Sequence, residues 1–231
     1  KLTDIDGNQF IDFVSGLLAV NLGYKDPNVT EAVISQISNG VTLSLPMPLE
    51  VDLSERIIDM IPCAERVRFC KNGSDATAAA VRVARGFTGR KLIVACGYHG
   101  WQDWYIGTTT RDLGIPDEVK RLTMKFPFND LDTLESLFKE HPNDIAAVIM
   151  EPSNMIAPEE GFLSGVKALT EKNGALLIFD EIIAGFRFAK GGGQELYGVT
   201  PDLCALGKGL ANGYPLAAVA GRATVMQVFE Q

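Results

Sequence analysis

The feature that most constrains the fold is a series of short, unbroken apolar runs that alternate with segments of helical spacing. Strands that are apolar at every position are buried on both faces of a sheet. Strands with one solvent-exposed face instead alternate apolar and polar residues. Apolar strands separated by helices therefore predict an α/β fold, a mostly parallel central sheet with helices on both faces. The predicted strands are ERVRFC (65–70), KLIVAC (91–96), DIAAVIM (144–150), ALLIF (175–179) and PLAAVAG (215–221).

Three segments between these runs are predicted to be helices. An alanine-rich segment at 74–87 follows the first strand, and apolar residues recur at helical spacing over 131–141. A third helix over 161–174 is closed by Gly174. Near the start of the chain, the turn Asp6-Gly7-Asn8 predicts a short strand pair.

Polar and reactive side chains follow the strands at the points where the strands end. In open α/β sheets, ligands bind beside the carboxyl ends of the strands. We therefore expect one site at this edge of the sheet. The groups found there are Asn72-Gly73-Ser74, Gly97-Tyr98-His99, Glu151-Pro152, Asp180-Glu181 and Gly207-Lys208.

Charge and apolar content narrow the class of protein. The 231 residues carry a net charge of −8, whereas a nucleic-acid-binding surface needs clustered Lys and Arg. No apolar run approaches the ~20 residues of a membrane-spanning helix, and no leader pattern precedes the first strand pair. The four cysteines lie far apart and there are only two histidines, which favours buried thiols in the cytoplasm over a metal site.

Gly73 and Ser74 stand where a helix is predicted to begin. Backbone amides at a helix N-terminus, with a serine hydroxyl as an extra donor, form an anion site. An ordinary serine cap of the helix is the competing interpretation.

The loop GYHGWQDWY, residues 97–105, concentrates aromatic side chains. A ring such as that of Tyr98 stacks on a flat cofactor with a preference of about 0.5–1.5 kcal/mol beyond burial. A small aromatic core is an equally good explanation of the same residues.

Asp180 ends an apolar strand, and a buried carboxylate is costly unless a cation or several donors meet it. A protonated pyridine nitrogen would serve as the partner, and an ion pair with Arg187 would serve equally. Lys208 is the only charge in LCALGKGLANGYPLAAVAG, residues 203–221. A lysine desolvated among apolar residues has a lowered pKa and becomes a nucleophile for carbonyl groups.

As a set, these motifs resemble the class III aminotransferases, which are pyridoxal-phosphate enzymes of fold type I, and in particular their glutamate-1-semialdehyde aminomutase-like branch. The resemblance runs from Asp4 to the end of the chain and keeps the family order. The motifs that carry it are DIDGNQFIDF, NGSDATAAAVRVARGFTGR, YHG, LLIFDEIIAGFR, GVTPDLCALGKG and NGYPLAAVAGR.

The resemblance implies a role for each matching residue. Lys208 would form the Schiff base with pyridoxal 5'-phosphate and move the proton, and Asp180 would hold the pyridine nitrogen protonated. Gly73 and Ser74 match the phosphate-binding turn. Tyr98 would stack on one face of the ring and Ile182 would lie against the other. The remaining cofactor-site residues are His99, which supports the loop, and Asn154.

Asn154 is included among the cofactor-site residues because the chain departs from the common family pattern at another position. Many members have Gln three residues after the Asp, where it contacts the phenolic oxygen of the cofactor, and here that position is Ile183. In the aminomutase-like branch an Asn after the EP motif takes this role. The aminomutases also carry a Trp where this chain has Leu17, and their loop after YHG is longer and gates the site.

The resemblance also implies an organisation and an assembly. Residues 1–45 would border a small domain and the active site, and residues 46–231 would form the large cofactor-binding domain. Family subunits are about twice as long, so the small domain would be incomplete in this chain. They are homodimers in which a Thr of one subunit reaches the phosphate site of the other.

Three functions remain. The favoured one is a transaminase that moves an amino group between an amino donor and a keto or aldehyde acceptor. The second is a 2,1-aminomutase, which must retain its diamine intermediate behind a gate. The third, a non-catalytic protein that has kept the fold, would be expected to lose Lys208 or Asp180, and both are present.

Overall fold

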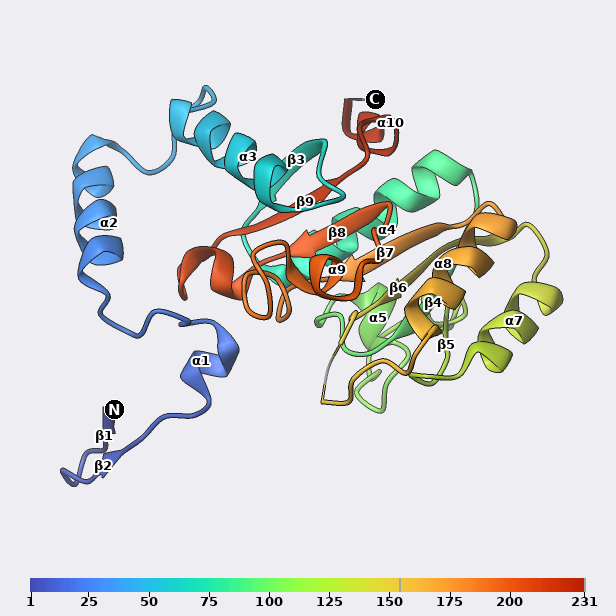
Figure 1. Cartoon of the computed structure of the whole chain (residues 1–231), viewed down its shortest axis with the longest axis horizontal. Helices are drawn as coiled ribbons and strands as arrows, with labels where there is room; N and C mark the ends of the chain where they lie inside the picture. Colours follow the sequence, from blue (N-terminus) through green and yellow to red (C-terminus); the bar gives the residue numbers. More distant parts are fainter. Residues whose placement is uncertain (154, 231) are drawn as a thin grey trace.

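The computed structural model describes residues 1–153 and 155–230. Its centre is a seven-stranded sheet in the order β3-β9-β8-β7-β6-β4-β5 (Figure 1). The pairs β4–β5, β4–β6, β6–β7 and β7–β8 are parallel, and β9 pairs antiparallel with both β3 and β8. The predicted α/β fold with a mostly parallel sheet is therefore confirmed.

The strands of this sheet are β3 (Arg66–Cys70), β4 (Leu92–Cys96), β5 (Thr123–Lys125), β6 (Ile145–Met150), β7 (Leu176–Asp180), β8 (Leu203–Leu206) and β9 (Ala217–Gly221). The helices are α2 (Pro27–Asn39), α3 (Pro48–Met60), α4 (Gly73–Thr88), α5 (Asp103–Ile106), α6 (Asp117–Lys120), α7 (Leu131–Glu140), α8 (Phe162–Lys172), α9 (Gly192–Tyr197) and α10 (Ala223–Met226). Two 3-10 turns follow β8 and α10, at Lys208–Ala211 and Gln227–Glu230.

Side chains of one strand alternate between two apolar layers. Leu92, Val94 and Cys96 of β4 belong to one buried cluster, and Ile93 and Ala95 belong to the other. Helices α3, α7 and α8 contribute to the first cluster, and α4, α5 and α10 contribute to the second. Helices thus cover both faces of the sheet, as the unbroken apolar runs predict.

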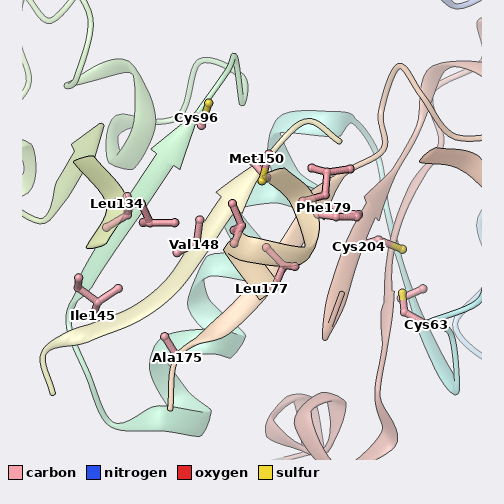
Figure 2. Packing of buried hydrophobic residues seen from close by; sticks show 14 of the residues in the cluster. Cys63, Cys96, Leu134, Ile145, Val148, Met150, Ala175, Leu177, Phe179 and Cys204 are labelled. Carbon is pink, nitrogen blue, oxygen red and sulfur yellow. The ribbon is translucent and has the colours of Figure 1, made fainter. Parts of the chain in front are cut away.

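The first layer is filled by large side chains of the central strands. Figure 2 shows Val148 and Met150 of β6 and Leu177 and Phe179 of β7 in this layer, all of them fully buried. Burying each such side chain contributes about 1.5–3 kcal/mol to the free energy of folding. The rigid layer fixes the carboxyl ends of β6 and β7, from which the polar residues of the site project.

Local sequence signals explain where helix α4 begins and ends. The Asn72 side chain accepts a hydrogen bond from the Asp75 amide at 3.0 Å, which caps the first turn. Gly89 closes the helix at φ +68°, a left-handed conformation that glycine adopts at low cost. The competing prediction of a serine cap is wrong, because Asn72 takes that role and leaves Ser74 free to face the cavity.

The N-terminal part of the chain extends away from the sheet (Figure 1). The predicted strand pair is present as β1 (Leu2–Thr3) and β2 (Gln9–Phe10), which pair antiparallel. The element labelled α1 (Ser15–Leu18) is a left-handed turn, with φ between +49° and +66° at all four residues. Helix α2 buries none of its residues. Among the described helices, none is long and apolar enough to cross a membrane.

Candidate active site

A cavity of about 320 Å³ lies at the carboxyl ends of the parallel strands. This volume falls at the small end of the roughly 300–1,000 Å³ range of ligand pockets. The sequence-predicted residues that line it are Gly73, Ser74, Tyr98, His99, Asp180, Ile182 and Lys208. The remaining predicted residue, Asn154, lies outside the described residues.

Lys208 enters the cavity from the turn that follows β8. It adopts φ +43°, a left-handed conformation that is unfavourable for a residue with a side chain. Burial lowers the pKa of its amine, and the charge of Arg187 lowers it further, while Asp180 and Glu151 oppose the shift. A larger fraction of the amine is therefore neutral, and hence nucleophilic, than for a solvated lysine.

Asp180 is the last residue of β7 and is only 4% exposed. Its Oδ2 lies 2.8 Å from Nδ1 of His99, and its Oδ1 accepts a hydrogen bond from the Ile182 amide at 3.1 Å. Arg187 is the alternative partner that the sequence allows. Among the described residues, however, no ion pair joins Arg187 to Asp180, and the Arg187 side chain donates to Ile183, Leu18 and Asn21 instead.

The partners of His99 define which ring nitrogen carries a hydrogen. Nε2 lies 3.1 Å from the carbonyl oxygen of Cys96, which can only accept, so Nε2 is the donor. The contact between Nδ1 and Oδ2 fixes the direction of the Asp180 carboxyl group, so His99 does more than support its loop.

The N-terminus of α4 and the loop after β4 form a narrow part of the cavity. The Ser74 hydroxyl accepts a hydrogen bond from the Trp101 amide at 3.3 Å. A Cβ on Gly100 would stand 2.3 Å from the Ser74 Oγ, and Gly100 has φ +97°. Only glycine permits this approach, so the loop leaves the first turn of α4 open to a ligand.

We expect Gly100→Ala to destabilise the cofactor-free protein by about 1–3 kcal/mol, because it combines backbone strain with a collision at Ser74. Gly114→Ala is the matched control, since Gly114 has φ +88° but no neighbour within 4 Å of the position that a Cβ would take. Urea denaturation measures both losses. Equal losses in the two variants would show that the contact with Ser74 contributes nothing.

Two glycines leave room for Ile182 at the floor of the cavity. A Cβ on Gly73 would stand 3.1 Å from Cδ1 of Ile182, and one on Gly207 would stand 3.0 Å from the same atom. Ile182 is therefore held between the start of α4 and the residue before Lys208. Ile183, the residue at the position of the family glutamine, also lines the cavity.

The aromatic loop divides into rings that are buried in a small core and rings that remain exposed beside the cavity. Trp104 and Tyr105 are buried and pack against the His99 ring, with ring centroids 6.2 Å and 5.2 Å away. Tyr98 and Trp101 instead remain exposed and line the cavity. The rings of Tyr105 and Tyr98 pack at nearly right angles with centroids 5.7 Å apart, so the small core supports the ring that lines the cavity.

Glu151 is a cavity residue to which the sequence assigned no role. It follows β6 just as Asp180 ends β7, and this position was the signal that could have identified it. A Cβ on Gly97 would stand 2.6 Å from the Glu151 carboxyl. Burial raises the pKa of Glu151 and repulsion from Asp180 adds to this, while His99, the Tyr98 amide and Lys208 act in the opposite direction.

This raised pKa predicts a pH dependence of stability. Folded Glu151 binds its proton more tightly than the unfolded chain does, so its contribution to stability is lost as the pH rises through the folded pKa. The unfolding free energy of the wild type minus that of Glu151→Gln should therefore decrease as the pH rises above 4.5, the ordinary pKa of this carboxyl group. Urea denaturation of the cofactor-free protein measures this, with Glu140→Gln on the surface of α7 as the control. A difference that grows with pH would contradict the sign.

The neighbouring carboxylate, Glu181, forms hydrogen bonds that hold two parts of the fold together. It is fully buried and accepts hydrogen bonds from the amides of Gly193 and Gln194 at 2.9 Å and 3.0 Å. Burial raises its pKa, and these amides oppose the rise. Glu181 thus anchors the start of α9 to the strand end that carries Asp180.

The cavity, with its partly buried lysine and buried aspartate, lies at the strand ends of a mostly parallel sheet, which is the edge where ligands bind in α/β proteins of this class. Comparison with known families makes this specific. The chain belongs to the class-III aminotransferase family, whose model matches residues 1–231.

Individual relatives carry two kinds of names. A 3-aminobutyryl-CoA aminotransferase of Cloacimonas acidaminovorans is 40% identical over 99% of this chain and 56% of its own length. A glutamate-1-semialdehyde 2,1-aminomutase of Aquifex aeolicus is 42% identical over 98% of this chain and 57% of its own length. A solved structure described as a transaminase with PLP bound superimposes with a TM-score of 0.93 at 30% identity, covering 99% of this chain and 57% of that one. The chain thus spans little more than half the length of these relatives.

Proposed function

We propose that this chain forms the cofactor-binding part of a pyridoxal-phosphate-dependent transaminase. The observation that carries the proposal is the convergence of Lys208, Asp180 and the N-terminus of α4 on one cavity. An amine nucleophile, a buried carboxylate and an anion-binding helix end are the three groups that the aldehyde, the pyridine nitrogen and the phosphate of this cofactor require.

The residues of the cavity fit the cofactor in shape as well as in chemistry. Gly73 and Gly100 place no side chain of their own at the start of α4, where backbone amides would bind a phosphate. Ile182 and Tyr98 present an apolar side chain and an aromatic ring to the same cavity, as a flat ring requires. When bound, pyridoxal phosphate would supply an electron sink for carbanion chemistry.

The chain's own residues then have separate tasks. Lys208 would hold the cofactor covalently and would carry the proton that moves during the reaction. Asp180 would accept a hydrogen bond from the protonated pyridine nitrogen, and His99 fixes the direction of the Asp180 carboxyl group. Ser74 and the first amides of α4 would bind the phosphate. Asn154, outside the described residues, is assigned to the phenolic oxygen, which the side chain of Ile183 cannot bind.

Transamination between two molecules is favoured over the internal transfer of an aminomutase. An aminomutase must retain its intermediate behind a closed gate, and this chain has Leu17 and a short loop where those enzymes carry a Trp and a longer gate. Relatives bearing both names match the chain, so the distinction depends on these positions.

The test uses the full-length protein loaded with pyridoxal phosphate. An amino donor alone should change the visible absorbance once, without turnover, and a keto or aldehyde acceptor should restore it. Turnover of an amino aldehyde with no second substrate would instead identify the aminomutase. A protein that takes up no pyridoxal phosphate, and stays colourless, would contradict the proposal.

We also propose that the protein works as a cytoplasmic homodimer. Helix α2 and the segment before it leave large apolar side chains exposed, among them Phe13 at 87% and Leu17 at 74%. A concentration of exposed large apolar side chains in one part of a chain favours an interaction site there. The four cysteines are all unpaired, in keeping with a reducing compartment. Light scattering of the full-length protein should give the mass of two subunits.

A further inference from the structure

Arg187, which the sequence offers as a partner of Asp180, has a different position in the structure. Its Nη2 donates hydrogen bonds to the Leu18 carbonyl and to Oδ1 of Asn21, the latter at 2.6 Å. Its Nε donates to the Ile183 carbonyl at 3.1 Å. One guanidinium thus joins the loop after β7 to a segment more than 160 residues earlier in the chain.

That segment, residues 18–24, which we call the docking segment, also contacts the turn that carries Lys208. Asn212 accepts a hydrogen bond from the Leu22 amide at 2.9 Å and donates one to the Gly23 carbonyl at 3.0 Å. A Cβ on Gly209, the residue after Lys208, would stand 2.6 Å from Nδ2 of Asn21. The docking segment therefore packs directly on the backbone that aims Lys208 into the cavity.

Backbone strain on both sides of this contact shows that it needs support. The docking segment begins at the end of the left-handed turn Ser15–Leu18, and Lys208 and Asn212 also have positive φ values, of 43° and 48°. The left-handed conformation is unfavourable for Leu18 and Lys208, whereas asparagine tolerates it better than most residues with side chains. Such conformations persist where surrounding contacts over-determine them, and the charged hydrogen bonds of Arg187 are among those contacts.

The charge of Arg187 also acts on Lys208. The charged groups that face the Lys208 amine are Asp180 from β7, Glu151 from the end of β6, and Arg187. The two carboxylates favour the ammonium form of the amine, and Arg187 disfavours it. Arg187 is therefore the one group of this set that works with burial to lower the pKa of Lys208.

We propose that Arg187 is a positioning residue, which fastens the docking segment onto the turn after Lys208 and thereby fixes how the amine enters the cavity. The inference rests on the proposed function only in taking Lys208 as the residue that holds the cofactor. It assigns to Arg187 no contact with the substrate or the cofactor.

Two measurements on the full-length protein test the proposal with Arg187→Gln and Arg187→Lys. Hydrogen exchange of the cofactor-free protein reports on the docking segment. A pH titration of the visible absorbance, after loading with pyridoxal phosphate, reports on the electrostatic environment of Lys208. Arg222→Gln is the matched control, because it also removes one positive charge, but from an ion pair with Asp202 at the opposite end of β8.

In Arg187→Gln, amides of the docking segment should exchange at least about tenfold faster, because the segment loses two charge-assisted hydrogen bonds from Arg187. The titration midpoint should rise, because a positive charge has been removed. Arg187→Lys keeps the charge, so it should retain the midpoint while exchange in the segment still increases. If Arg187→Gln does not fold, the exchange rate of the docking segment in Arg187→Lys alone tests whether Arg187 fastens that segment.

Two results would overturn the proposal. The first is that the amides of the docking segment in Arg187→Gln exchange at a rate within twofold of the wild-type rate. The same conclusion would follow if Arg222→Gln raised their exchange rate by an equal factor. The second is faster exchange with an unchanged midpoint in Arg187→Gln, since this would make Arg187 a structural anchor without influence on Lys208. A protein that binds no pyridoxal phosphate would contradict the proposed function. The exchange measurement on the cofactor-free protein would still test whether Arg187 fastens the docking segment.

Discussion

Replacing Lys208 with alanine is expected to reduce transaminase turnover by a factor on the order of 10⁴. Lys208 is the amine of the cavity whose pKa is lowered by burial, and in the proposed function it would supply both the covalent link and the proton transfer. Alanine offers neither group. The measurement is single-turnover kinetics of the loaded protein with an amino donor in excess.

The variant should fold normally, because alanine meets the same left-handed strain at position 208 that lysine already tolerates. Borohydride should fix the cofactor to the wild type and leave Lys208→Ala unlabelled. Lys139→Ala is the control, since Lys139 forms an exposed pair with Glu135 on α7 and such pairs contribute little. Retention of most of the activity in Lys208→Ala would revive the hypothesis of a non-catalytic protein that kept the fold.

The sequence predicts the central sheet well, because strands that are buried on both faces are apolar at nearly every position. The runs that became β4, β6 and β7 are apolar at nearly every position, and the structure buries every residue of these strands. Strand β5 was not predicted. It is three residues long, lies at the sheet edge and ends with an exposed lysine, Lys125, so it lacks the unbroken apolar pattern.

The site residues could be predicted where a charged side chain stands in an otherwise apolar stretch of sequence. Lys208 and Asp180 are charged groups beside apolar runs, and the structure brings both to one cavity. Pairings between distant segments left no such signal. Nothing in the local sequence reveals that His99, rather than Arg187, meets Asp180, because both side chains can donate to a carboxylate.

The left-handed turn at Ser15–Leu18 was beyond any local rule. Leucine at positions 17 and 18 disfavours positive φ, so propensity argues against the observed conformation. Arg187 donates a hydrogen bond to Leu18 at the end of the turn, and Asn212 accepts one from Leu22 just after it, so both help to hold the turn in place. Contacts across the fold override local preference here, and only a three-dimensional structure reveals them.

Asp180→Asn is expected to lower turnover by a factor on the order of 10³ while leaving the fold intact. The asparagine amide keeps the shape of the carboxyl group but not its charge, so it no longer favours a protonated pyridine nitrogen. The surrounding hydrogen bonds can all be retained. Oδ1 still accepts from the Ile182 amide, and Nδ2 can donate to Nδ1 of His99, which is free to accept because Nε2 carries the hydrogen toward Cys96.

Asp180→Ala separates the chemistry from the structure. It leaves Nδ1 of His99 buried without its partner, which should cost about 1–3 kcal/mol of stability, whereas Asp180→Asn should remain within about 1 kcal/mol of the wild type. Both variants should lose turnover to a similar extent. Urea denaturation of the cofactor-free proteins, set beside single-turnover rates, gives the two quantities independently. If turnover followed stability, with Asp180→Asn nearly fully active, Asp180 would serve only to hold His99 and its loop in place.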